Sequence, residues 1–381
     1  MIEFMPSEDQ KAFREMAEDF ARNEIRPNAI EWDEEKHFPT DVLVRAGALG
    51  LGAIYTRDDV GGTGLGRVDS VMIFEALAKG CPTIAAYISI HNMCCWMVDT
   101  YGTEIQREEW CPRLATMETL ASYCLTEPGA GSDASALSTK AVRDGDDYLL
   151  TGQKQFISGA GSSDVYLVMA RTGEGGPAGI SAFLIEKGAQ GLSFGANERK
   201  MGWSAQPTRT VSMDNVRVPA SAMLGAEGQG FRIAMSGLDG GRLNIAACSL
   251  GGAQAALDAT LAYMRERKAF GKSLLDMPVL QFRVADMATR TEVARTILWR
   301  AASSLDARSP EATTLCAMAK QFVTDECFSV ANEALQLHGG YGYLSEYGIE
   351  KIVRDLRVHQ ILEGTNEIMR LIVSRSVIAK G

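Results

Sequence analysis

Long apolar runs are missing from this 381-residue sequence. No stretch approaches the roughly 18 consecutive apolar residues that a membrane-spanning helix needs, so the sequence predicts no transmembrane segment. Clusters of lysine and arginine are also missing, and the net charge at pH 7 is −10. Because nucleic-acid affinity is built from clustered cations, this composition argues against a nucleic-acid-binding protein.

A leader sequence is the third missing feature. Residues Met1 to Pro6 have neither the apolar segment of a signal peptide nor the arginine-rich pattern of a transit peptide. We therefore expect a bacterial cytoplasmic protein, or a protein of the mitochondrial matrix if a leader has already been removed.

The cysteines and histidines show no ligand spacing. None of the eight cysteines forms a Cys-x-x-Cys pair, and several lie within apolar helical patterns, so we expect reduced core residues. The four histidines are scattered along the chain, and the sequence predicts no metal site. With 46% apolar residues, the chain should form a compact fold of two or three domains.

Residues 1–120 have the pattern of a helical domain. Ser7 and Gln10 have the spacing of a capping box, and apolar residues then recur on one helical face. A later helical pattern, residues 83–101, is unusually apolar. We expect His91 within it to be a hydrogen-bonded core residue, because no nucleophile lies nearby to pair with it.

Residues 121–230 change to a strand-like pattern. Short runs separated by turn residues predict a small antiparallel sheet or barrel. Gly129 to Ala134 matches the dinucleotide fingerprint G-x-G-x-x-A, but a strand pattern follows where a Rossmann domain needs a helix, so we expect no Rossmann domain. Glu127, which precedes a proline, is interpreted as a turn residue and not as a second catalytic base.

Residues 231–381 return to helical patterns, the first of which runs to about Arg267. A continuous apolar seam along these helices predicts a four-helix bundle, and apolar surface left over would form an oligomer interface. The predicted fold is therefore mainly α with a central β domain. It comprises an N-terminal α-helical domain (1–120), a small antiparallel β-barrel or sheet domain (121–230) and a C-terminal four-helix bundle (231–381).

Glu363 lies between two helical patterns near the end of the chain. The apolar pair Ile361 and Leu362 precedes it, and Gly364 follows. If that neighbourhood is buried, the carboxylate loses solvation, and its pKa rises towards the range in which a general base works at neutral pH. The alternative is a solvated glutamate at a helix junction, and these residues alone favour that alternative.

Three segments resemble the acyl-CoA dehydrogenase family: Tyr123 to Asp133, Leu335 to Tyr343, and Glu363-Gly-Thr-Asn-Glu367. The resemblance extends over essentially the whole chain. It implies a homotetrameric enzyme that oxidises acyl-CoA thioesters to 2-enoyl-CoA with FAD and passes the electrons to an electron-transferring flavoprotein. It also implies that Glu363 is the catalytic base, since the position that supplies the carboxylate in other branches of the family is Gly241 here.

The resemblance assigns further residues to the cofactor and the substrate. Those expected to contact FAD within the subunit are Tyr123, Leu125, Thr126, Gly131, Ser132, Phe156, Ser158, Thr365 and Glu367. Those expected to contact the FAD of a neighbouring subunit are Arg267, Phe270, Gln336 and Gly340. Those expected to contact the acyl-CoA are Ser132, Asp239, Arg242 and Gly364. Without the resemblance, Arg267 would be interpreted as a solvated cation at a helix end, and Asp239 and Arg242 as a routine ion pair.

The expected substrate carries a short branched acyl chain. Ile88 to Met93 and Leu238 to Asn244 resemble the members of the family that act on isobutyryl-CoA. Straight short-chain and 2-methylbutyryl thioesters stay open. Two rival functions also stay open: a flavin oxidase or monooxygenase on the same scaffold, which would consume oxygen when given substrate, and a cofactor-free acyl-CoA-binding protein, which would purify colourless.

Overall fold

The computed structural model describes residues 5–379. Its N-terminal part is a group of helices. They are α1 (Glu8–Phe20), α2 (Ala29–Glu35), α3 (Thr40–Ala48), α4 (Arg67–Ala78), α5 (Pro82–Tyr101) and α6 (Glu104–Ala115). The predicted capping box of Ser7 and Gln10 begins α1, because each side chain accepts a hydrogen bond from the backbone N–H of the other residue.

Helix α5 is buried along nearly its whole length, as its apolar sequence predicts. His91 lies in its middle with Nε2 2.8 Å from the carbonyl oxygen of Leu114, and its Nδ1 accepts the backbone N–H of Ala121 at 3.1 Å. Nε2 therefore carries the proton, and burial lowers the pKa of the ring to about 4. His91 is a neutral core residue that joins α5 to the first strand, as expected.

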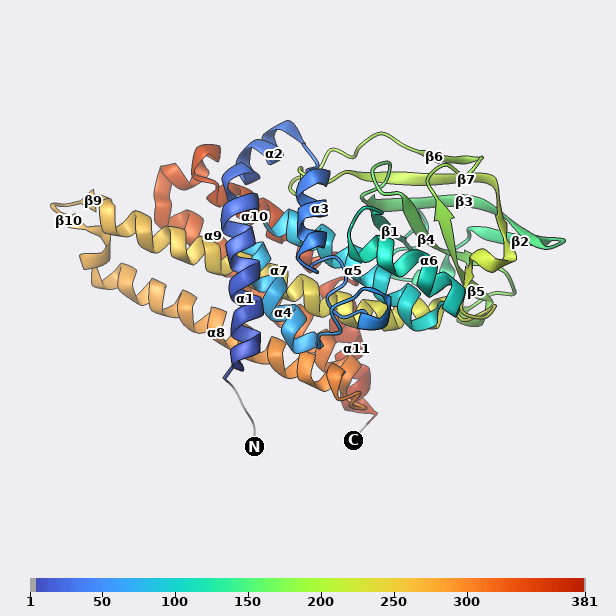
Figure 1. Ribbon diagram of the computed structural model, residues 1–381. Coiled ribbons are helices and arrows are strands. Elements are labelled where there is room, and N and C mark those ends of the chain that lie inside the picture. Colours follow the sequence, from blue (N-terminus) through green and yellow to red (C-terminus); the bar gives the residue numbers. More distant parts are fainter. Residues whose placement is uncertain (1–4, 380–381) are drawn as a thin grey trace.

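The central part of the chain forms one sheet with the strand order β6-β7-β3-β2-β4-β5-β8, and β1 pairs with β4 beside this path (Figure 1). The strands are β1 (Ala121–Cys124), β2 (Lys140–Asp144), β3 (Asp147–Ser158), β4 (Val165–Arg171), β5 (Ile180–Glu186), β6 (Leu192–Phe194), β7 (Thr208–Pro219) and β8 (Met223–Leu224). Strands β4 and β5 are buried on both faces apart from their last residues.

The sheet is mixed and not purely antiparallel. β1 runs parallel to β4, with Ala121 opposite Val165 and Cys124 opposite Val168. The sequence pattern could not show this, because strand direction depends on how the connecting loop returns and not on the alternation of side chains. β3 is a single strand of 12 residues, with an irregular register against β7 near Gly152.

The C-terminal part contains three long helices: α7 (Gly230–Glu266), α8 (Pro278–Asp306) and α9 (Ala312–His338). The shorter α10 (Ile349–Arg357) and α11 (Asn366–Ile378) complete it. A small hairpin of β9 (Lys268–Ala269) and β10 (Lys272–Ser273) connects α7 to α8, and it lies at the opposite end of the molecule from the large sheet (Figure 1). The predicted class of fold is confirmed, whereas the residue boundaries of the three domains stay a prediction.

Helix α7 is long and apolar enough, by length and composition, to cross a membrane. However, 67% of its most apolar stretch is buried inside the fold, against α4, α5 and α9 among others. This burial is that of a central core helix, and it explains the apolar composition without a membrane.

All eight cysteines are buried and unpaired, as predicted. Among residues 5–379, no three His, Cys, Asp or Glu side chains lie close enough together to hold a metal ion.

Candidate active site

Glu363 lies in the turn that precedes α11. Its backbone is left-handed, with φ at +54°, and Gly364 follows with φ at +92°. The residue as a whole is half-buried, but its Oε2 atom is buried and has no hydrogen-bond partner. A solvated glutamate at a helix junction does not match that environment.

A glycine on α7 makes room for this carboxylate. A Cβ atom at Gly241 would lie 2.3 Å from Oε2 of Glu363 and 3.1 Å from Sδ of Met93. Any side chain at position 241 would therefore displace Glu363 from its place against α7. The glycine and the buried glutamate are two parts of one arrangement.

Burial raises the pKa of Glu363 to about 7, and the positive charges of Lys320 and Arg242 keep it from rising further. Arg242 reaches the same turn directly, since its Nε donates to the carbonyl oxygen of Glu363 at 3.3 Å. Its NH1 is 2.7 Å from a carboxylate oxygen of Asp239. A carboxylate with a pKa near 7 suits proton abstraction at neutral pH, because both of its states are populated there.

Five of the residues predicted to contact FAD lie together on β1 and β3 or directly after β1. The backbone N–H of Gln155 donates to the carbonyl oxygen of Thr126 at 2.8 Å, and Ser122 Oγ donates to that of Ser158 at 2.6 Å. These bonds hold β1 and the segment after it against the end of β3 at one site. The five residues are Tyr123, Leu125, Thr126, Phe156 and Ser158.

A second unpartnered atom lies at this site. The hydroxyl of Tyr123 is buried without a hydrogen-bond partner, and the charge of Glu363 raises its pKa further, after the larger effect of burial. Buried polar atoms without a partner are rare in folded proteins. Two of them, on residues whose charges interact, fit a site that a ligand completes, and the aromatic and hydroxyl groups of β1 and β3 fit the ring of a flavin.

The remaining residues predicted for this end of the site are more open. Gly131 and Ser132 lie in an exposed loop, where a Cβ at Gly131 would meet nothing within 4 Å. Thr365 caps α11 by accepting from the backbone N–H of Ile368, and Glu367 is exposed. The fold leaves these groups accessible to a ligand but does not enclose one with them.

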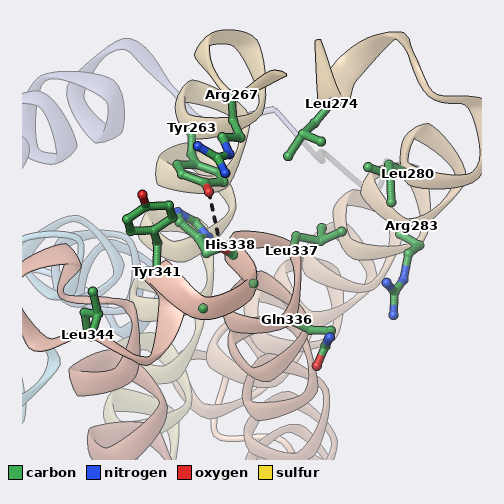
Figure 2. A pocket seen from close by; sticks show the side chains of 12 residues that line it. Tyr263, Arg267, Leu274, Leu280, Arg283, Gln336, Leu337, His338, Tyr341 and Leu344 are labelled. Carbon is green, nitrogen blue, oxygen red and sulfur yellow. Dashed lines mark hydrogen bonds between the residues drawn. The ribbon is translucent and has the colours of Figure 1, made fainter. Parts of the chain in front are cut away.

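Three other predicted residues line a separate cavity of about 410 Å³ (Figure 2). They are Arg267, Gln336 and Gly340, and the guanidinium of Arg267 lies 5.2 Å from the ring centre of Tyr341. Phe270 does not line this cavity; it lies in the turn of the β9–β10 hairpin and is 97% exposed. Arg267 follows the end of α7, so at 1.5 Å per residue it is about 39 Å from Gly241. The predicted site residues of one chain thus form two groups that no single flavin dinucleotide can span.

Sequence reasoning missed two fully buried lysines. Lys320 lies fully buried on α9 and donates to the carbonyl oxygen of Gly364. The helical pattern held a signal for it, because Lys320 is in step with the buried residues Cys316, Val323 and Cys327. Lys154 lies fully buried on β3, where its Nζ is 2.7 Å from a carboxylate oxygen of Glu127. Nothing in the sequence indicated that Glu127 and Lys154 form an ion pair, because the two residues are far apart in the chain.

The Glu127–Lys154 pair holds the start of the predicted cofactor loop. Glu127 also accepts from the backbone N–H groups of Ser138 and Thr139, at 2.6 and 2.9 Å. Burial alone would raise the pKa of Glu127, but Lys154 and these hydrogen bonds lower it to about 2. Glu127 is therefore a structural anion in a turn, as its place before Pro128 suggested, and not a base.

Replacing Lys154 by methionine should destabilise the protein by about 3–5 kcal/mol, because it leaves Glu127 buried without its cation. Thermal unfolding followed by circular dichroism measures the loss. The double variant Glu127→Gln/Lys154→Met is the matched control and should recover much of the stability, since it removes both charges. A Lys154→Met protein as stable as the wild type would contradict this role.

Models of the acyl-CoA dehydrogenase N-terminal, middle and C-terminal domains match residues 7–118, 122–216 and 228–378. Mitochondrial isobutyryl-CoA dehydrogenase of Bos taurus is 53% identical over 98% of this chain and 89% of that protein. The Dictyostelium discoideum enzyme of the same name is 55% identical over 97% and 89%. The structure of butyryl-CoA dehydrogenase from Megasphaera elsdenii superposes with a TM-score of 0.96 at 35% identity, covering 99% of this chain and 100% of that one. The chain belongs to the acyl-CoA dehydrogenase family.

Proposed function

We propose that this chain oxidises isobutyryl-CoA, or a closely related short branched acyl-CoA, to the 2-enoyl-CoA with Glu363 as the base. Membership of the family makes it an FAD-dependent acyl-CoA dehydrogenase. The observation that carries the role of Glu363 is its buried, unpartnered Oε2, whose charge acts on the equally unpartnered hydroxyl of Tyr123. The substrate follows from the high identity to isobutyryl-CoA dehydrogenases.

The groups of the Glu363 turn suit removal of a proton next to a thioester carbonyl. Oε2 can accept the proton without first giving up a hydrogen bond, and protonation relieves a buried negative charge. In the described part of the chain, the backbone N–H of Glu363 donates to no protein group. It is therefore free to bind the thioester oxygen, on which negative charge develops. Bound FAD would supply the acceptor for the hydride that leaves the β-carbon.

The position of Met93 supports a short acyl chain. Its sulfur lies against Gly241, beside the carboxylate of Glu363, and the side chain is buried. A thioether at this place fills space that a longer acyl chain would need. We propose that Ser132, Asp239, Arg242 and Gly364 contact the CoA thioester at the same site.

We propose that two copies of the chain share each FAD within a homotetramer. Tyr123, Leu125, Thr126, Gly131, Ser132, Phe156, Ser158, Thr365 and Glu367 would hold the flavin end. Arg267, Phe270, Gln336 and Gly340 of another copy would hold the adenosine and diphosphate end. The separation of about 39 Å along α7 supports sharing, because one chain cannot bring both groups to one cofactor.

Titration of the flavin-loaded protein with acyl-CoA esters tests the substrate. Isobutyryl-CoA should bleach the flavin absorbance faster than butyryl-CoA or 2-methylbutyryl-CoA. Met93 would limit the length of the acyl chain, and the relatives of this chain are isobutyryl-CoA dehydrogenases. Rapid oxygen consumption with substrate would instead favour an oxidase. Bleaching by none of the esters would contradict the proposal.

We further propose that an electron-transferring flavoprotein reoxidises the enzyme. Since the isobutyryl-CoA dehydrogenases of Bos taurus and Dictyostelium discoideum are mitochondrial enzymes, we propose the mitochondrial matrix or the bacterial cytoplasm as the compartment.

A further inference from the structure

Lys320 is a buried cation without an ion-pair partner in the described part of the chain. Its side chain is fully buried on α9, and its Nζ donates to the carbonyl oxygen of Gly364 and to Oδ1 of Asn366, both at 2.8 Å. Both acceptors are uncharged, and both belong to residues that closely follow Glu363. Because a buried ammonium group without an anion is unfavourable, a nearby negative charge should account for its presence.

Asn366 extends this contact into a small network. Its amide nitrogen donates to Thr324 Oγ1 at 2.9 Å and to Asp325 Oδ1 at 2.7 Å, both on α9. Asn366 is the first residue of α11 and is itself buried. The network therefore fixes the turn that carries Glu363 to α9 on one side, while Arg242 binds its carbonyl oxygen from α7 on the other.

The other charges nearby are already balanced. Arg242 is paired with Asp239, and Asp325 accepts from Gln360, Asn366 and Arg370. Burial keeps the ring of His359 neutral by lowering its pKa to about 3. The titratable groups that act on Glu363 or Lys320 are Tyr55, Tyr123, Arg242, Cys248, Asp325, His359 and Glu367. Among the carboxylates, Glu363 has the largest effect on the pKa of Lys320, which it raises.

We propose that Lys320 is a positioning residue for the reaction: its ammonium group holds the Glu363 turn through Gly364 and Asn366, and its charge favours the ionised form of the Glu363 carboxylate at neutral pH. The inference rests on the proposed role of Glu363 as the base. It assigns Lys320 no contact with the substrate or the flavin.

The sign of the pH effect follows from the charges. Burial lowers the pKa of Lys320 to about 8, so Lys320 is still mostly charged at pH 7, where Glu363 titrates. Glu363 must be ionised to accept a proton, so the rate of flavin reduction falls as the pH drops below about 7. Burial raises the pKa of Glu363, and the charge of Lys320 lowers it. Removing that charge should therefore raise the pKa of Glu363, and with it the pH at which the rate is half its maximum, by about one pH unit. The rate should then fall about fivefold at pH 7 and recover at about pH 9.

The experiment compares Lys320→Met with Thr324→Val, the matched control, which weakens the same network without removing a charge. Flavin reduction by isobutyryl-CoA is measured against pH. In parallel, infrared spectroscopy follows the C=O stretch of the protonated carboxyl in the FAD-loaded protein without substrate, and Glu363→Gln identifies the band. We expect the midpoint to rise in both measurements for Lys320→Met only. If the Lys320→Met protein does not fold, Lys320→Gln is used in its place.

A lower rate at every pH with an unchanged midpoint would overturn the proposal, since it would leave Lys320 a purely structural role. The infrared measurement separates the proposed function of the protein from the proposed role of Lys320. If no acyl-CoA reduces the wild-type flavin but the carboxyl midpoint still rises in Lys320→Met, the proposed function fails and the electrostatic role of Lys320 stands.

Discussion

Replacing Glu363 by glutamine should slow the reduction of bound flavin by isobutyryl-CoA by about 10²–10⁴-fold, the range that a well-placed general base contributes. Glutamine has nearly the same shape and keeps the contact with Gly241, but its amide cannot take the proton. The buried Oε2 of Glu363 has no other partner, so the substitution breaks no hydrogen bond of that atom in the folded protein. Stopped-flow absorbance under anaerobic conditions measures the rate.

FAD content and acyl-CoA binding should stay near the wild-type level in this variant, which separates the loss of a base from the loss of a site. Glu108→Gln, at an exposed position on α6, is the control for a neutralised carboxylate and should react normally. A Glu363→Gln protein bleached at the wild-type rate would refute the assignment of the base.

Arg267→Ala should lose most of its bound FAD and its activity, because it removes the cation that we propose for the cofactor diphosphate. If two copies share each cofactor, co-expression with Glu363→Gln should restore activity. In a mixed dimer, one site combines the intact Glu363 of one chain with the intact Arg267 of the other. Random pairing gives such a site at about one quarter of all positions. Specific activity and flavin content of the doubly tagged, co-purified protein measure the recovery.

Each variant expressed alone is the baseline for this complementation. Gln336→Ala, which alters the same cavity, is a second partner for Glu363→Gln and covers the case in which Arg267→Ala folds poorly. Co-purified mixtures no more active than the separate variants would contradict the shared site and favour a cofactor held within one chain.

The helical framework was readable from the sequence because its signals are local. The capping box of Ser7 and Gln10 begins α1, and α9 spans Ala312–His338 as its apolar period indicates. The parallel pairing of β1 with β4 was not readable, since it joins residues about 44 positions apart and depends on the path between them.

The turn that carries Glu363 also depends on parts of the chain that are distant in the sequence. The sequence identified Glu363 only through its resemblance to a family, because the residues around it fit a solvated turn equally well. Burial decides between the two, and burial here comes from α7, whose Gly241 admits the carboxylate. Lys320 was missed for the converse reason: a lysine in an apolar helical period looks like an exposed residue until its acceptors, Gly364 and Asn366, are brought to it by α11.

The fate of the C2 hydrogen in a single anaerobic turnover tests the central claim most directly. Isobutyryl-CoA deuterated at C2 is mixed with the flavin-loaded wild-type and Glu363→Gln proteins, and the thioester is analysed by mass spectrometry alongside the flavin absorbance. We predict that the wild type releases the deuteron and bleaches more slowly than with unlabelled substrate, while the variant leaves the label in place. Release of the deuteron by Glu363→Gln at the wild-type rate would show that another group takes the proton.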